Sequence, residues 1–209
     1  MVISHLHVDH MGGMKASRSN QIIAPSELGL PQGVSCYVPE EASAVSFNCR
    51  IVDKPIILAA GIATTGPLGR SLFFLGLCEE QALIANIKDK GLVILTGCGH
   101  PTLEVIMKMV KKISDRPVYA IGGGLHFPVT GGSYNVAGLR LQSFIGTGKP
   151  PWERITDQDL DKTIAVLNYF KPHKVYLSAH DTCDYALTRL QQELTAEVEV
   201  FKAGATYRF

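Results

Sequence analysis

The feature that most constrains this sequence is a cluster of three histidines and an aspartate within six positions near its start. His5, His7, Asp9 and His10 are interspersed with apolar residues and are followed by two glycines. Residues two apart on an extended turn point the same way, so His5 and His7 can hold one metal ion while Asp9 and His10 hold its neighbour. The chain has seven histidines in all, and a chance cluster on a solvent-exposed loop is the competing interpretation.

The residue types in this cluster indicate the ion. Neutral imidazole and carboxylate oxygen are good ligands for zinc, with iron and manganese as alternatives. Two such ions about 3.5–4 Å apart can polarise a water between them and clamp an ester or phosphoryl oxygen. The sequence therefore predicts a site for one or two divalent metal ions.

Apolar runs typical of buried strands each lead into a loop that carries histidine. Residues 2–3 precede the first cluster, and the runs 92–95, 118–121 and 175–177 lead into His100, His126 and His180. Helical periodicity or a capping residue marks segments between these runs, at 103–110, 156–170 and 184–194. Strands that alternate with helices predict one layered α/β domain over residues 1–209, with ligands at the strand ends.

The remaining segments give weaker signals. Residues 50–59, 71–77 and 197–201 have the composition of strands, and residues 79–87 are expected to form a helix that ends at Gly91. Residues 21–47, rich in proline, glycine and serine, are expected to be irregular.

Composition narrows the class of partner. Hydrophobic residues make up 46% of the chain and charged residues 19%, which is an ordinary globular balance. The net charge of +1 gives no reason to expect nucleic acid or a membrane surface, so we expect a small-molecule substrate. No apolar run is long enough to span a bilayer, and no signal-peptide pattern is present. The five cysteines include no C-x-x-C pair, which favours reduced thiols and a cytoplasmic location.

The histidine cluster resembles the H-x-H-x-D-H signature of the metallo-β-lactamase superfamily. Later motifs are similar, in the same order, to those of its dihydropterin-ribofuranosylaminobenzene-phosphate synthase-like metallohydrolases. They are T-G-P-L-G-R at 65–70, G-L-V-I-L-T-G-C-G-H at 91–100, I-G-G-G-L-H-F at 121–127 and H-D-T at 180–182. The resemblance covers nearly the whole chain. It implies an αββα sandwich with a metal site at the upper edge of its sheets.

Relatives of this kind have a run of strands before the signature, whereas here the signature begins four residues after Met1. The resemblance therefore implies a sandwich that lacks part of its first sheet. Exposed sheet edges would favour poor solubility, a homo-oligomer or a complementing N-terminal segment.

The resemblance also implies roles for individual residues. The expected metal ligands are His5, His7, Asp9, His10, His100 and His180. Cys98 stands where relatives often have a metal-bridging aspartate, and is either a further ligand or an inert buried thiol. His126 is expected to bind the metal or to contact the substrate. Arg70 is expected to meet an anionic substrate group, or else to be a surface arginine. Asp181 replaces the cysteine of the usual H-C-T-G motif, and can join the ligands, orient His180 or do neither.

The function expected on this basis is hydrolysis of an ester or phosphoester bond by a metal-activated water. The substrate class is a small anion, pterin-phosphate-like if the branch is followed, and the expected catalytic residues are Asp9, as proton acceptor, and His126. The alternative is a metal- or ligand-binding protein of the same fold without turnover. A degraded, non-functional chain is the third interpretation, and the presence of every expected histidine argues against it.

Overall fold

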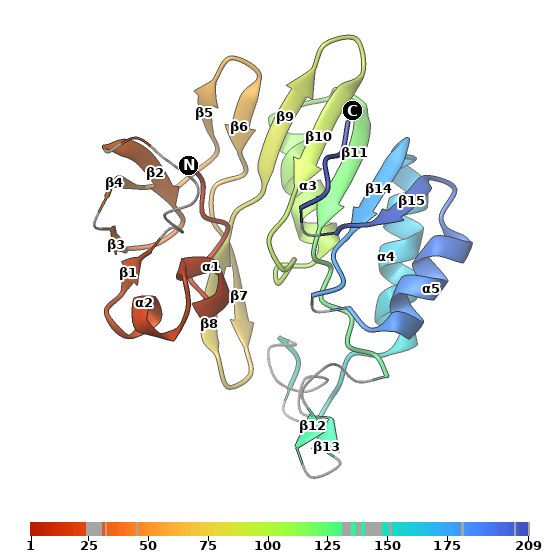
Figure 1. Cartoon of the computed structure of the whole chain (residues 1–209). Helices are drawn as coiled ribbons and strands as arrows, with labels where there is room; N and C mark the ends of the chain where they lie inside the picture. Colours follow the sequence, from red (N-terminus) through yellow and green to blue (C-terminus); the bar gives the residue numbers. More distant parts are fainter. Residues whose placement is uncertain are drawn as a thin grey trace.

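A seven-stranded mixed β-sheet forms the centre of the molecule (Figure 1). The computed structural model describes residues 1–23, 31, 33–44, 46–130, 135–136, 139–140, 148–150, 152–180, 182–202 and 204–208. The strand order is β15-β14-β11-β10-β9-β6-β5. Their bounds are β5 Ile56–Ala59, β6 Ile62–Thr64, β9 Leu83–Ile87, β10 Gly91–Leu95, β11 Val118–Gly123, β14 Lys174–Leu177 and β15 Glu197–Val200. The pairs from β10 to β15 are parallel, and those from β10 to β5 are antiparallel.

Three helices pack against this sheet (Figure 1). They are α3 Leu103–Ile113, α4 Asp157–Phe170 and α5 Asp184–Glu193. Buried residues of all three join Ile94, Ile121 and Leu177 of the strands in one apolar cluster. Burial of positions 103, 106, 107 and 110 in α3 has the helical spacing that the sequence predicts. Val93 and Tyr176 lie in a separate, smaller cluster, against which Phe201 packs.

The first part of the chain forms a smaller unit beside the sheet (Figure 1). It contains helices α1 Val8–Met11 and α2 Met14–Arg18, and the parallel strand pairs β1 Gln21–Ile22 with β3 Ser43–Ala44 and β2 Val34–Val38 with β4 Phe47–Ile51. A second apolar cluster holds it together, made of Met11, Ala16, Ile22, Cys36 and Val38. The hairpin of β7 Leu68–Leu72 and β8 Gly76–Glu80 follows, and β12 Asn135–Val136 pairs with β13 Leu139–Arg140.

Four sequence-based expectations are corrected by these elements. The helix expected over residues 79–87 is wrong: these residues end β8 and form β9. The strand expected over 71–77 is interrupted by a turn, since residues 71–72 end β7 and residues 76–77 begin β8, and the strand expected over 50–59 divides into β4 and β5. The segment 21–47 contains short strands rather than being irregular throughout. For residues 83–87, pairing of β9 with both β6 and β10 overrides the local helix propensity.

The ends of the buried strands position the histidine loops. Because β10, β11 and β14 are parallel neighbours, their carboxyl ends meet at one edge of the sheet. The loops after these ends carry Cys98, His100, His126 and His180, as the sequence predicts. No helix in the described ranges is long and apolar enough to cross a membrane.

Candidate metal centre

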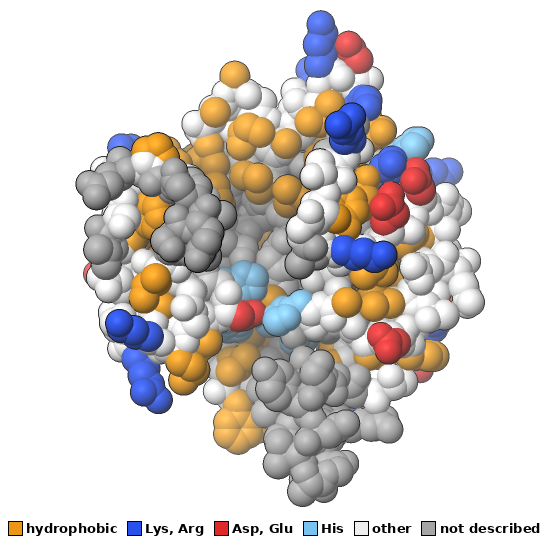
Figure 2. Space-filling view, in the orientation of Figure 1, with side chains coloured by type: hydrophobic (Ala, Val, Ile, Leu, Met, Phe, Trp, Pro, Cys, Tyr) orange, Lys and Arg blue, Asp and Glu red, His pale blue; other side chains and the backbone are white. Residues whose placement is uncertain are grey.

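The histidine cluster lies in the turn that leads into α1. His7 is the N-cap of this short helix, which ends at Gly12 with a φ of 105°. A Cβ at Gly12 would lie 2.2 Å from the carbonyl oxygen of Ile23, so a side chain at this position would collide with the backbone. The tight turn keeps the cluster at the sheet edge. Figure 2 shows histidine and acidic side chains at the floor of a hollow between the two parts of the molecule.

One group of donors is buried. Single ligand atoms of His5, His7, His100 and Cys78 all lie within 4.8 Å of one another. Nε2 of His100 is 3.1 Å from Nδ1 of His7, and the His5 ring centroid is 4.6 Å from that of His7. His5 is fully buried, and His100 and Cys78 are each 3% exposed. Three histidines of the predicted set are therefore brought together, with a thiol that the sequence analysis did not single out.

A second group lies nearer the solvent, with Asp9 and His180 exposed and Cys98 buried. Asp9, Cys98 and His180 also place ligand atoms within 4.8 Å of one another, and so do His5, His10 and Cys98. Nε2 of His180 is 2.8 Å from Oδ2 of Asp9, and Nε2 of His10 is 3.2 Å from Sγ of Cys98. These side chains border a cavity of about 300 Å³, which Gly97, Gly124 and Ser178 also line. Cys98 therefore lies among the predicted ligands, at the junction of two groups.

The protonation states suit metal binding. Burial and the neighbouring His10 lower the pKa of His5 to about 2, so its imidazole is neutral. Nδ1 of His5 lies 3.1 Å from Ser4 Oγ, while Nε2 is buried without a hydrogen-bond partner among the described residues. A hydrogen bond with His10 holds the pKa of Asp9 well below its usual range, so this carboxylate is ionised. A neutral imidazole with an unused buried nitrogen beside an ionised carboxylate is the donor set that a divalent ion requires.

Glu80, which the sequence analysis missed, holds the loop that carries Cys98 and His100. Its Oε1 accepts hydrogen bonds from the backbone N–H of Gly97 (3.0 Å) and Gly99 (2.9 Å), and its Oε2 from that of His100 (3.0 Å). Oε2 is also 3.8 Å from Nδ1 of His5. Burial raises the pKa of this carboxyl group, and the N–H donors oppose that shift. The sequence analysis missed Glu80 because it expected a helix over 79–87. In a strand, alternate side chains share a face, and this alternation places Glu80 on the same side as Cys78.

His126 and Arg70 border a different cavity, of about 190 Å³, together with Lys149 and Asp159. The His126 ring centroid is 4.9 Å from that of His100, and His126 belongs to neither donor group in the described part of the chain. Nη1 of Arg70 donates a hydrogen bond to the carbonyl oxygen of His100 at 2.8 Å. Arg70 is thus half-buried behind the histidines rather than a fully exposed surface arginine. Asp181 lies outside the described residues.

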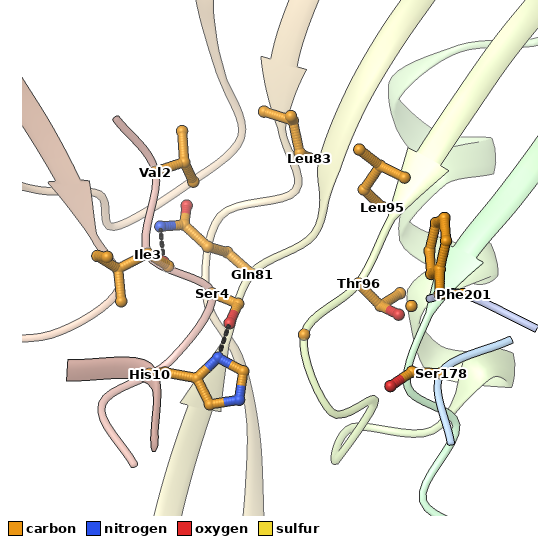
Figure 3. A pocket seen from close by; sticks show the side chains of 12 residues that line it. Val2, Ile3, Ser4, His10, Gln81, Leu83, Leu95, Thr96, Ser178 and Phe201 are labelled. Carbon is orange, nitrogen blue, oxygen red and sulfur yellow. Dashed lines mark hydrogen bonds between the residues drawn. The ribbon is translucent and has the colours of Figure 1, made fainter. Parts of the chain in front are cut away.

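A third cavity, of about 420 Å³, opens beside His10 (Figure 3). Its walls are largely apolar, with side chains of Val2, Ile3, Leu83, Leu95 and Phe201. Ser4 lies at the boundary between this cavity and the metal-binding groups, and its Oγ is 3.2 Å from Nδ1 of His10 (Figure 3). The donors thus have an apolar cavity on one side and a cavity lined by both basic and acidic residues on another.

Comparison with known proteins identifies the fold. The structure is similar to that of Tm1679, a metal-dependent hydrolase of the beta-lactamase superfamily, with a TM-score of 0.67 and 17% identity over 100% of this chain and 78% of that one. It is also similar to the metallo-beta-lactamase fold protein YhfI from Bacillus subtilis, with a TM-score of 0.48 and 11% identity over 98% of this chain and 75% of that one. No protein-family model matches the chain.

One curated relative matches part of the sequence. It is the 7,8-dihydropterin-6-methyl-4-(beta-D-ribofuranosyl)-aminobenzene-5'-phosphate synthase of Methanocaldococcus jannaschii, 25% identical over 60% of this chain and 55% of that protein. The match therefore spans about half the length of that relative. Together with the mixed sheet and its helices, the similarity to Tm1679 shows that the chain has the metallo-β-lactamase fold that its signature predicted.

Proposed function

We propose that this protein is a metal-dependent hydrolase that acts on an ester or phosphoester bond of a small anionic substrate. The observation that carries the proposal is the convergence of donors from distant segments at one sheet edge. They are His5, His7, Asp9, His10, Cys98, His100 and His180. A structural role in packing would not require so many imidazoles in mutual contact, nor a buried nitrogen of His5 that has no hydrogen-bond partner among the described residues.

The ions and the side chains around them would have different roles in this reaction. One or two divalent ions, with zinc suited to this donor set, would lower the pKa of a water towards neutrality and polarise the bond to be broken. Asp9 lies at the solvent-exposed side of the cluster with an ionised carboxylate, where it can bind an ion or accept a proton. Glu80 fixes the backbone of the loop that carries His100, so that this ring is held in place before any ligand arrives.

Two cavities beside the donors indicate the kind of substrate. Arg70 borders the 190 Å³ cavity next to His126, and a guanidinium fork suits a phosphate or carboxylate group. Lys149 and Asp159, which form an ion pair, and Glu104 also line this cavity. The apolar cavity of about 420 Å³ would receive a flat, uncharged portion of the same molecule. A pterin phosphate combines both features, and the name of the archaeal relative is consistent with this choice.

The test is metal content measured together with hydrolysis. Protein purified without chelator or histidine tag should contain about one or two equivalents of zinc, iron or manganese by plasma mass spectrometry. It should also hydrolyse at least one member of a panel of phosphomonoesters, phosphodiesters, carboxylic esters and pterin phosphates. The His7→Ala/His10→Ala variant should lose the metal, and its rate should fall by at least about 100-fold.

His173→Ala is the matched control, because His173 is exposed and stacks on Tyr119, away from the site. It should keep both metal and activity. Bound metal without turnover of any substrate in the panel would favour the metal- or ligand-binding alternative. A wild-type protein that takes up no zinc, iron or manganese would contradict the proposal.

A further inference from the structure

Strand β8 directs two side chains towards the histidines. Cys78 and Glu80 are two residues apart, and both are buried, whereas Leu77 between the hairpin turn and Cys78 is exposed. Side chains two apart on a strand point to the same face. Glu80 reaches the loop of His100 and approaches His5, so its partner on this face, Cys78, is carried to the same place.

The position of Cys78 completes a set of four donors. Its Sγ and one ring nitrogen each of His5, His7 and His100 lie within 4.8 Å of one another. Three imidazoles and one thiolate make four ligands, the number that zinc takes in closed tetrahedral sites. An independent observation also indicates a ligand here: Nε2 of His5 is fully buried and has no hydrogen-bond partner among the described residues.

We propose that Cys78 is the fourth protein ligand of the ion held by His5, His7 and His100. The inference rests on the metal centre of the proposed function. When the ion binds, the S–H bond breaks, the proton leaves to solvent and the sulfur electron pair forms the bond to the ion. The site then has no open position, because four protein donors fill a tetrahedral shell.

This arrangement separates the two donor groups by role. The group with Cys78 is buried and closed, and serves to hold the histidine turn against the sheet edge. The group of Asp9, Cys98 and His180 borders the 300 Å³ cavity, and Asp9 and His180 are exposed. Substrate therefore has access to the second group, and the first stabilises it from behind. A buried cysteine that only packs against its neighbours would give no sulfur-to-metal charge-transfer band.

The experiment uses cobalt(II) as a spectroscopic probe in the full chain. Cys98 is the other thiol near the histidines, so it is first replaced in all proteins by Cys98→Ser. One equivalent of Co²⁺ is added, and the near-ultraviolet sulfur-to-cobalt charge-transfer band and the visible d–d bands are recorded. The same measurement is made after adding Cys78→Ser, and after adding Cys36→Ser as the matched control. Cys36 is also a buried thiol, but lies in the separate apolar cluster of the first part of the chain.

We expect the charge-transfer band in Cys98→Ser and in the control with Cys36→Ser, and its loss when Cys78→Ser is added. Cobalt affinity should fall by about 10–100-fold in the last protein, as judged by titration. Zinc X-ray absorption on Cys98→Ser, which leaves Cys78 intact, should show one sulfur at about 2.3 Å. This measurement does not depend on the folding of a Cys78 variant.

Bound cobalt with d–d bands but no charge-transfer band in Cys98→Ser would overturn the assignment of Cys78 and leave the metal centre intact. A band that survives Cys78→Ser would also overturn it. If the wild-type protein binds no cobalt at all, both the assignment and the proposed function fail.

Discussion

At the scale of single residues, Glu80 shows how a buried carboxyl group organises the site. Its two oxygens accept three backbone hydrogen bonds from the loop that follows β10, and Glu80 as a whole is 1% exposed. Backbone N–H groups that lost this acceptor would be left unsatisfied in the interior. The residue therefore positions the backbone at His100.

Replacing Glu80 by glutamine tests this positioning role. An amide has one oxygen, so Glu80→Gln forces an NH₂ group against a backbone N–H that now donates to a carboxylate. We expect an unfolding free energy lower by about 1–3 kcal/mol in chemical denaturation. We also expect zinc affinity lower by about 10–100-fold in a chelator-competition titration.

Glu79→Gln is the control, because Glu79 is the neighbour of Glu80 on β8 but lies on its other face. It should leave both quantities unchanged. Equal zinc affinity in Glu80→Gln and wild type would show that the carboxylate serves only the loop's stability.

At the scale of elements, the sequence predicted an element correctly where residues within that element determine its structure. The helical spacing of the buried residues in α3 and the Thr156–Asp159 capping box of α4 can each be recognised from a few neighbouring residues. The structure confirms both. Strands β10, β11 and β14 were also predictable, because their continuous apolar runs are typical of strands buried on both faces.

The β7–β8 hairpin and β9 were not predictable in this way. Glu79, Glu80, Gln81 and Ala82 favour a helix by local propensity. The structure instead pairs Leu83 with Leu95 and Ile84 with Ala63, contacts that no local window contains. The histidines could be found because their residue type is scarce, whereas Cys78 and Glu80 depend on that hairpin and could not.

The start of α4 gives a pH-dependent prediction. Burial opposes ionisation of Asp159, but hydrogen bonds from Lys149 and Thr156 hold its pKa below the usual range. A depressed folded pKa contributes stability above the unfolded value of about 3.9, and that contribution is lost as pH falls through the folded pKa. Asp159→Asn should therefore lower the unfolding free energy at pH 7 by about 0.5–2 kcal/mol, the usual range for a lost cap.

Urea denaturation of both proteins from pH 7 to pH 3 checks this. The difference between them should stay constant above about pH 5 and shrink below about pH 4. Asp161→Asn, on the same helix but outside the capping box, controls for the loss of one charge. A difference that does not vary with pH would contradict the ionic origin of the cap.

At the scale of the whole molecule, the donors join two separately packed parts. His5, His7, Asp9 and His10 belong to the part built on β2 and β4, whereas Cys98, His100 and His180 follow strands of the seven-stranded sheet. An ion that binds both sets links the two apolar clusters. Its binding free energy is therefore added to the stability of the whole chain.

Thermal unfolding measures this linkage. Zinc at about 100 times its Kd should stabilise the folded state by about 2.7 kcal/mol, which corresponds to roughly 5–10 °C in Tm for a chain of this size. Circular dichroism with zinc and with a chelator would record the shift. His7→Ala should abolish it, and His173→Ala should retain it. Identical melting curves with zinc and chelator would contradict the bridging role.

Ser4 contacts both His5 and His10, so the positions of the protons on these two rings depend on each other. Its Oγ lies 3.1 Å from Nδ1 of His5 and 3.2 Å from Nδ1 of His10. For both rings to offer Nε2 to ions, both Nδ1 atoms must carry a proton and donate to the same hydroxyl oxygen, which has two lone pairs. With either Nε2 protonated, the hydroxyl instead donates to that ring. The tautomers of two imidazoles are thus coupled through one serine. The direction of its O–H bond would therefore depend on how many ions are bound.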